Sequence, residues 1–194
     1  EMLRSLVGSE MCIRDSNYAW ILNMVSKLSS NGVAGFILAN GALSADGTEG
    51  EIRRKMIERG LVEAIVILPR NLFYSTDISV TLWILNANKK ARIVHRNGEE
   101  IHYRDREKEI LFIDMRQMGE PFEKKYVRFT DEDICKVADA YHNWQREGHT
   151  ETYTDIPEFC KSVSVGEDGG IADKGFSLVP VSYTHLTLPT NSRV

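Results

Sequence analysis

Over residues 17–90, apolar residues alternate between helical spacing and short continuous runs. In residues 17–28 they recur three or four positions apart, which predicts a helix with one buried face and with Asn17 as its N-cap. Three runs are too short to be helices and predict buried strands: Val33–Ala39, residues 63–68 and residues 78–85. The first of these strands is expected to be buried on both faces.

A helix is expected between the first two strands. Thr48 and Glu51 stand three residues apart, which is the spacing of a capping box at a helix start. Gly60 closes this helix, whose inward positions are Ile52, Met56 and Ile57. The order strand, helix, strand is typical of an α/β sheet that is covered on both faces.

The second half of the chain is more polar. The pair Asn97-Gly98 is a turn signal and predicts a hairpin, while the mixed charges of residues 104–109 indicate a solvated loop or helix face. Residues 110–114 are a further candidate strand. Thr130 is expected to cap a helix, and the inner face of that helix holds Ile134, Val137, Ala138, Tyr141 and Trp144.

The composition is that of a globular domain, with 42% hydrophobic and 27% charged residues among 194. No apolar run approaches the roughly 20 residues that cross a bilayer, so no membrane association is expected. The three cysteines form no C-x-x-C pair, which argues against a disulfide framework or a zinc site and favours a cytoplasmic location. The formal charge of −4 argues against a free-standing, non-specific DNA binder.

Several separated blocks together carry a family resemblance. NYAWILNMVSKLSSNGVAGFILANGALS (residues 17–44) and GTEGEIRRKMIERGLVEAIVILPRNLFYSTDISVTLWILNANK (residues 47–89) are similar to the modification subunit of type I restriction–modification systems. The similarity continues, in the family's order, through ILFIDMRQMG, FTDEDICKVADAYHNW and IADKGFSLVP. It covers most of residues 17–180.

The resemblance implies an adenine-N6 DNA methyltransferase with a class I, Rossmann-like α/β fold that uses S-adenosylmethionine. On that template the chain supplies the fifth, sixth and seventh strands of the sheet, and the seventh runs antiparallel. The implied partners are DNA and the specificity and restriction subunits of the type I complex.

The two motifs that carry the chemistry in this family are absent from the sequence. None of the five prolines follows another proline, an Asn or an Asp, so the Asn-Pro-Pro-Phe motif that holds the target adenine is missing. No G-x-G-x-x-G cofactor loop occurs either. We therefore expect this chain alone to be inactive, and S-adenosylmethionine to bind only the full-length parent.

The resemblance divides the chain into four parts. Residues 17–90 correspond to the second half of the methyltransferase domain, and residues 91–180 to a C-terminal α+β extension of the modification subunit. Residues 1–16 and 181–194 match nothing in the family and resemble translated sequencing-adaptor read-through, so they are foreign tails. We expect neither end to pack into the core.

Candidate site residues lie near the carboxyl ends of the predicted strands. In the related enzymes the region after the second strand borders the target-base pocket, so Phe73, Tyr74 and Trp83 are candidate walls for a flipped adenine. Burial in the core is the competing interpretation for Phe73 and Trp83. Asn40 and Gly41 follow the first strand, where α/β sheets place ligands, although a plain turn explains them equally well.

Two arginines are candidates for contact with the DNA backbone. Arg53 and Arg54 belong to a basic helix face, for which a solvated helix surface is the alternative interpretation. No histidine has metal-ligand spacing. Two other functions stay open, a non-catalytic α/β scaffold or interaction domain, which the missing cofactor loop would favour, and another nucleotide-dependent α/β enzyme.

Overall fold

The computed structural model describes residues 17–166 and 168–184. Its centre is a mixed sheet of five strands in the order β1 (Val33–Ala39), β3 (Val80–Asn86), β2 (Val62–Ile67), β6 (Glu109–Asp114) and β9 (Cys160–Ser164). β3 runs antiparallel to both β1 and β2, β2 is parallel to β6, and β9 is antiparallel to β6. The expected antiparallel third strand is therefore confirmed, and β1, β2 and β6 all point the same way.

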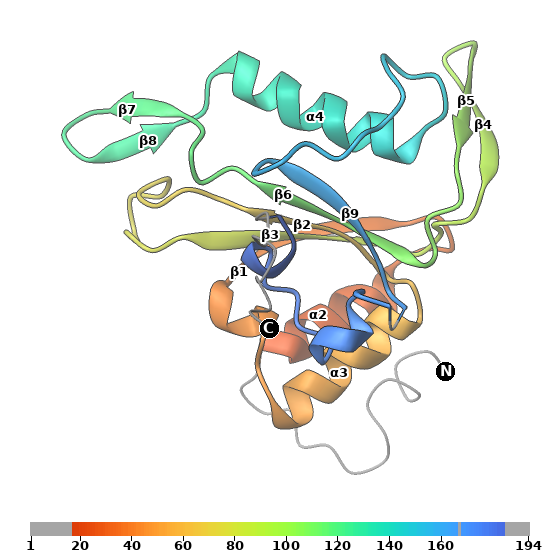
Figure 1. Ribbon diagram of the computed structural model, residues 1–194, viewed down its shortest axis with the longest axis horizontal. Helices are drawn as coiled ribbons and strands as arrows, with labels where there is room; N and C mark the ends of the chain where they lie inside the picture. The colour runs from red at the N-terminus through yellow and green to blue at the C-terminus, as the bar shows by residue number, and fades with distance from the viewer. Residues whose placement is uncertain (1–16, 167, 185–194) are drawn as a thin grey trace, which may run out of the picture.

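Helices cover both faces of this sheet. Figure 1 shows α2 (Asn17–Lys27) and α3 (Gly47–Glu58) on one face and α4 (Asp131–Gln145) on the other. The short helix α5 (Val181–Thr184) lies on the same side as α2 and α3, as does the 3-10 turn η1 (Asn40–Leu43). Every residue of β2 is buried, as a central strand between two covered faces requires.

Two hairpins extend from the body of the molecule near opposite ends of α4 (Figure 1). One consists of β4 (Arg92–Arg96) and β5 (Glu99–Tyr103), and its turn residues Asn97 and Gly98 have φ of +54° and +83°. These angles confirm the predicted Asn-Gly turn, since such turns need positive φ at both positions. The other consists of β7 (Glu120–Phe122) and β8 (Tyr126–Arg128) and was not predicted.

The core has two layers, one on each face of the sheet. Trp83 is fully buried in the layer under α2 and α3, where its ring stacks on Phe36 and meets the edge of Tyr18. The inward positions predicted for α3 are all buried. The layer under α4 contains Leu111, Ile113 and Trp144.

β1 has the predicted bounds but is not buried on both faces. It is an edge strand, with β3 on one side and no strand among the described residues on the other. Val33 and Ile37, which lie on the same face of this strand, are 55% and 46% exposed. An apolar run predicts that a strand is covered, but it does not identify the segment that covers it or show whether that segment is among the described residues.

Two local predictions for the helices are wrong. α3 begins at Gly47, whose φ is +61°, so Thr48 lies inside the first turn and no side chain caps that end. In α4 the capping box of Thr130 and Asp133 is present as expected. Ile134, however, is 54% exposed and does not join the inner face.

The C-terminal end of the described chain packs more closely than expected. Tyr183 is buried, its ring lies 4.6 Å from that of Phe112, and its hydroxyl donates to the Ser177 carbonyl (2.7 Å). The expectation that residues after 180 stay out of the core is therefore wrong for this side chain, which offers a large apolar ring to an open part of β6. Residues 1–16 and 185–194 lie outside the described residues.

Candidate functional site

The carboxyl ends of three parallel strands meet at one edge of the sheet. Asn40 follows β1, Pro69 lies just beyond β2, and Met115 follows β6. The Asn40 side chain is held in place by the Thr81 hydroxyl on β3, which lies 3.2 Å from its Oδ1. In open α/β sheets this is the edge where ligands bind.

A cleft of about 830 Å³ opens at this edge. Its volume is within the ~300–1,000 Å³ range of small-molecule and cofactor sites. The lining comes from four segments that are far apart in the sequence: η1, the loop after β2, the stretch from β6 through the β7–β8 hairpin, and the residues before α5. The polar side chains among them are Asn40, Arg70, Asn71, Ser79, Arg116, Gln117, Glu123, Lys124, Lys125 and Tyr126.

The loop after β2 and the β7–β8 hairpin form one continuous wall of this cleft. The backbone N–H of Val127 donates to the Asn71 carbonyl (3.1 Å), and Asn71 itself has a φ of +59°. The rings of Tyr74 and Tyr126 meet edge to face with centroids 4.6 Å apart. The hairpin is thus attached to the loop by both backbone and side chains.

The cleft is basic although the whole chain carries a formal charge of −4. Four cationic side chains line it, against the single carboxylate of Glu123. Arg116 is paired with the nearly buried Asp114, its Nη2 lying 2.6 Å from Oδ2, and this hydrogen bond raises the pKa of Arg116. Lys124 and Lys125 are exposed at the hairpin tip.

The predicted base-pocket residues separate into three groups. Asn40 lines the cleft, and Gly41 is exposed next to it. Tyr74 is 69% exposed and reaches the cleft wall through its contact with Tyr126. Phe73 is half-buried against the core layer under α4, and Trp83 is buried in the opposite layer, so the packing interpretation describes Trp83.

The two arginines of α3 lie in different environments. Arg53 is 3% exposed, and its guanidinium donates to the carbonyls of Phe176 (2.9 Å) and Ala45 (2.7 Å). It fastens η1 and the segment before α5 to α3, which leaves little of its guanidinium for a phosphate. Arg54 is exposed and pairs with Glu58 at 2.7 Å.

The β7–β8 hairpin and Arg116 were not predicted from the sequence as parts of a site. β7 and β8 are only three residues long, so they show no alternating pattern. The one available signal was local, a basic pair followed by an aromatic residue, Lys124-Lys125-Tyr126.

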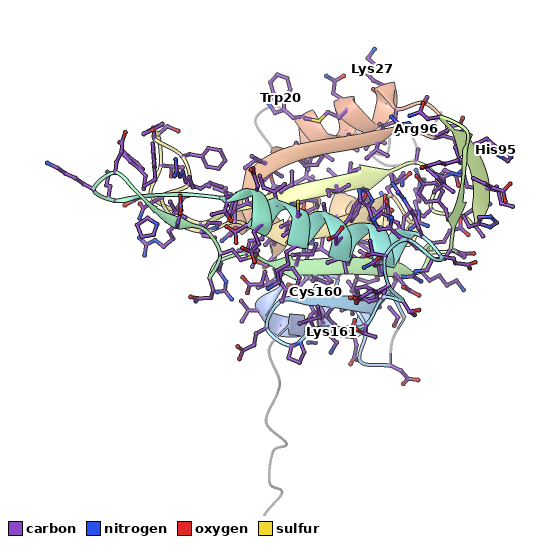
Figure 2. The ribbon with its side chains drawn as sticks, turned by 90° about the horizontal axis from the view of Figure 1, so that it is seen from above. Trp20, Lys27, His95, Arg96, Cys160 and Lys161 are labelled. Carbon is purple, nitrogen blue, oxygen red and sulfur yellow. The ribbon has the colours of Figure 1, made fainter. Side chains whose placement is uncertain are left out.

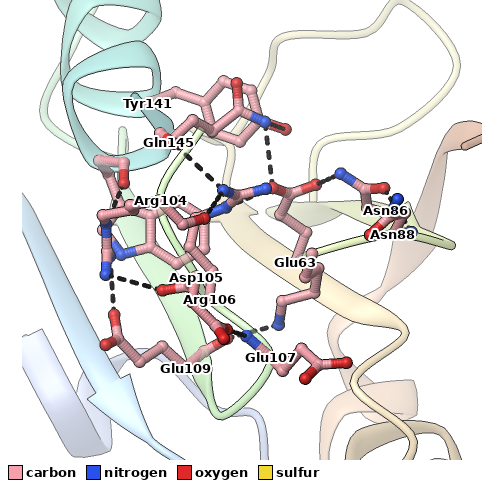
Figure 3. A network of polar contacts seen from close by, with 12 residues as sticks. Glu63, Asn86, Asn88, Arg104, Asp105, Arg106, Glu107, Glu109, Tyr141 and Gln145 are labelled. Atoms are coloured by element: carbon pink, nitrogen blue, oxygen red, sulfur yellow. Dashed lines mark hydrogen bonds and ion pairs between the residues drawn. The ribbon is translucent and has the colours of Figure 1, made fainter. Parts of the chain in front are cut away.

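A second polar cluster lies at the amino ends of β2 and β6, which is the opposite edge of the sheet (Figure 3). The Glu63 carboxylate, fully buried, accepts hydrogen bonds from Arg106 Nε (3.2 Å) and Gln145 Nε2 (3.0 Å). Asn86 donates to its second oxygen, and Tyr141 contacts Gln145. The expectation of a solvated charge run is wrong for Arg106, which is 1% exposed and pairs with Glu63 on the neighbouring strand β2.

The same cluster continues through Lys89 and Glu109. Lys89 Nζ donates to the carbonyls of Val62 (2.8 Å) and Glu109 (2.5 Å), and burial lowers the pKa of Lys89 to about 8. Burial alone would raise the pKa of Glu109, but hydrogen bonds from Arg104 and Ser162 bring it below its usual value. Because Gln145 of α4 donates to Glu63 of β2, this cluster joins α4 to the sheet.

The family model for N-6 DNA methylases matches residues 11–188. The chain belongs to this family. The match includes parts of both predicted foreign tails. A type I restriction enzyme methylase subunit of Haemophilus influenzae (HindI) is 39% identical over 170 residues, or 87% of this chain. A Methanocaldococcus jannaschii subunit of the same kind (MjaIX) is 32% identical over 90% of this chain.

Solved structures agree with these relatives. The methyltransferase subunit of a type I restriction–modification system from Streptococcus thermophilus superposes with a TM-score of 0.73 and 25% identity over 94% of this chain. The EcoKI M protein shares the fold, with a TM-score of 0.52 and 17% identity over 74% of this chain. The chain therefore has the methyltransferase fold that the resemblance implied.

The chain spans about a third of the length of these relatives: 34% of the Haemophilus subunit, 28% of the Methanocaldococcus subunit and 33% of the Streptococcus structure. Among the described residues, no group of three or more His, Cys, Asp or Glu is placed to hold a metal ion. No helix in this part of the chain is long and apolar enough to cross a membrane.

Proposed function

We propose that the whole protein to which this chain contributes is the modification subunit of a type I restriction–modification system. It would transfer a methyl group from S-adenosylmethionine to adenine N6 in DNA. The observation that carries this proposal is the basic, aromatic-rimmed cleft at the carboxyl edge of the sheet in a member of the N-6 DNA methylase family. Flipped bases are bound in pockets of this kind, where aromatic rings stack on them.

The cofactor does not fit the residues described here. S-adenosylmethionine carries one carboxylate, which a cation can bind, but its sulfonium and ammonium groups need carboxylate or carbonyl acceptors. The cleft instead presents Arg70, Arg116, Lys124 and Lys125 against Glu123 alone. We therefore assign cofactor binding to parts of the protein outside these residues and derive no catalytic step through it.

The residues that are present suit the nucleic acid. Asn40 and Tyr74 stand on the rim of the cleft, and the basic side chains complement phosphate. In this proposal Tyr74 stacks beside the extruded adenine and Asn40 contacts its polar edge. Gly41 leaves room next to them, since a Cβ at this position would meet nothing within 4 Å.

The unpaired edge of β1 supports the idea that more of the protein packs here. Val33 and Ile37 are exposed on this strand, and Trp20 on the adjoining α2 is 66% exposed. Exposed apolar side chains on and near an open strand edge are typical of a surface that another segment covers. We propose that the remaining two thirds of the methyltransferase completes the sheet on this side.

The organisation along the chain follows from the same proposal. Residues 17–90 would supply the end of the catalytic sheet, and residues 91–180 the extension that contacts the specificity and restriction subunits in the cytoplasm. β6 and β9 of the extension continue the sheet of the first part, so the two parts share one core.

Two measurements test the proposal. The full-length protein with its partner subunits is expected to transfer tritiated methyl groups to adenine in duplex DNA. The 194-residue chain alone is expected to show neither transfer nor saturable binding of S-adenosylmethionine by calorimetry. A full-length protein that binds its partners without any methyl transfer would favour a non-catalytic α/β scaffold, and micromolar cofactor binding by the chain alone would refute the division of labour proposed here.

A further inference from the structure

We propose that the β7–β8 hairpin is a phosphate-binding arm whose tip, Lys124 and Lys125, contacts the backbone of duplex DNA beside the cleft. This inference rests on the proposed function in one respect, that DNA is the substrate. It assigns the contact to a segment that lies between the blocks of family resemblance, and it specifies the DNA backbone as the group that this segment binds.

The position of the hairpin suits such a role. Figure 1 shows it extending away from the sheet beyond the first turn of α4. Glu123, Lys124 and Lys125 form its exposed tip, while Tyr126 and Val127 turn back to line the cleft. A duplex that placed one nucleotide in the cleft would therefore pass its backbone close to the tip.

The arm is preorganised by contacts at its base. Val127 donates to the Asn71 carbonyl, and Arg128 pairs with Glu120 on the facing strand at 2.6 Å. The Arg128 guanidinium also lies 5.1 Å from the centre of the Phe122 ring. Since the base is already fixed, binding at the tip orders few additional groups, and less of the interaction free energy is lost to entropy.

The two lysines differ from two of the arginines near the cleft. Arg116 is paired with Asp114 and Arg128 with Glu120, but Lys124 and Lys125 make no ion pair with any described residue. Lys125 lies over the ring of Tyr126, with Nζ 5.2 Å from the ring centre. Exposed lysines beside tyrosine rings are typical of nucleic-acid-binding surfaces, where the cations contact phosphates and the rings contact bases.

The salt dependence of binding tests this assignment. Fluorescence anisotropy measures the association of the full-length protein and its partner subunits with a fluorescein-labelled duplex. The salt concentration is varied from about 50 to about 300 mM, a range over which the screening of exposed charges changes. In the variant Lys124→Gln/Lys125→Gln, the slope of log K against log[salt] is expected to fall by about 2. The affinity at 0.1 M salt should fall roughly 10- to 60-fold, which is what two released counterions give.

A matched control removes two lysines elsewhere. Lys27, at the end of α2, and Lys161, on β9, are exposed and lie away from the hairpin (Figure 2). The variant Lys27→Gln/Lys161→Gln changes the charge by the same amount and should leave the salt slope unchanged. Glu123→Gln removes the only carboxylate of the tip and should tighten binding about twofold, the opposite direction.

Each outcome decides the inference. A lysine double variant with the wild-type slope and affinity overturns it. The inference is also overturned if the double variant binds DNA normally but no longer copurifies with a partner subunit, because the hairpin would then be a protein-docking site. Methyl transfer at saturating DNA is measured in parallel. If the lysine double variant loses salt slope but the wild-type protein transfers no methyl group, the proposed function is refuted and the assignment of the hairpin as a phosphate-binding arm is retained.

Discussion

The two edges of the sheet hold charged side chains in opposite ways. At the amino ends of β2 and β6, Glu63 and Arg106 have fully buried side chains and are joined by Gln145 and Asn86. At the carboxyl ends the cations line an open cleft, and those at the hairpin tip are exposed. A buried ion must be paired within the protein, whereas an exposed one stays free to bind a ligand. The first edge is therefore structural and the second is where a function is sought.

α4 connects these edges. Its capped first turn follows the hairpin that flanks the cleft, and its last turns place Tyr141 and Gln145 in the buried cluster. Figure 1 shows the helix running the length of the sheet between them. A substitution at the buried cluster should therefore lower the stability of the whole fold, whereas a substitution beside the cleft should have only local effects.

The largest effect is expected from breaking the buried ion pair. Glu63→Ala leaves the Arg106 guanidinium charged and buried, and Arg106 Nη2 already has no hydrogen-bond partner among the described residues. Removing one partner of such a pair costs about 3–5 kcal/mol of unfolding free energy. Urea unfolding followed by circular dichroism measures the loss. The exposed Lys124→Ala is the control, with a change within about 0.5 kcal/mol. Equal effects at both positions would contradict the distinction drawn here.

The bounds of the strands could be predicted from the sequence more accurately than the burial of side chains at the amino ends of β2 and β6. The strand bounds follow from local apolar runs, and β1 begins and ends where its run does. The burial of Arg106 was not predicted because its partner Glu63 is 43 residues away, and a local charge run does not indicate a distant carboxylate. β1 was misjudged because strand burial depends on neighbours that a local pattern does not contain.

The cleft shows the same limit for function. Asn40 and the loop containing Tyr74 could be predicted, since each follows a buried strand and the carboxyl edge is where ligands bind. The β7–β8 wall could not, because three-residue strands have no period and the wall forms only when Val127 meets Asn71 across the fold. The expected reaction came from the family resemblance, whereas the β7–β8 wall of the cleft is visible only in the structure.

The buried cluster should also respond to pH through Lys89. Burial lowers its folded-state pKa to about 8 from the usual 10.5. Between these values the unfolded chain binds more protons than the folded one, so stability rises as pH increases through that window. The rise should be roughly 2 kcal/mol between pH 7 and 9.5. Lys89→Met should abolish it.

At higher pH, buried groups whose pKa values are raised act in the opposite direction, and Tyr18 is one of them. Burial raises the pKa of Tyr18 to about 12, so tyrosine ionisation in the unfolded chain lowers stability above its usual pKa of 10. Unfolding is therefore compared at pH 7, 8, 9 and 9.5 in both proteins. A pH profile of Lys89→Met that parallels the wild type would show that another group controls stability in this range.

At the cleft, the expected effect is on activity and not on stability. Tyr74→Ala in the full-length enzyme should weaken methyl transfer by up to ~1–3 kcal/mol, the scale of one lost base–aromatic stack. Folding should be largely spared, since the ring is 69% exposed and its described ring contact is with Tyr126. The ratio kcat/KM on a duplex substrate measures the loss, and Tyr74→Phe should restore most of it. Wild-type kinetics in Tyr74→Ala would leave the residue structural and direct attention to Phe73.

The smallest effect concerns the end of α4 beside the cleft. The Thr130 hydroxyl accepts from the Asp133 backbone N–H (3.1 Å), and the Asp133 carboxylate accepts from the Thr130 N–H (2.9 Å). Thr130→Ala removes the first of these bonds and should cost about 1 kcal/mol, the usual loss for an N-cap. Because Gln145 is held in the buried cluster at the far end, the helix should fray only at its first turn. Hydrogen exchange should accelerate for the amides of residues 131–134 and stay slow for those of residues 140–145. Uniform acceleration along the helix would mean that α4 opens as one unit and that the two edges are not independent.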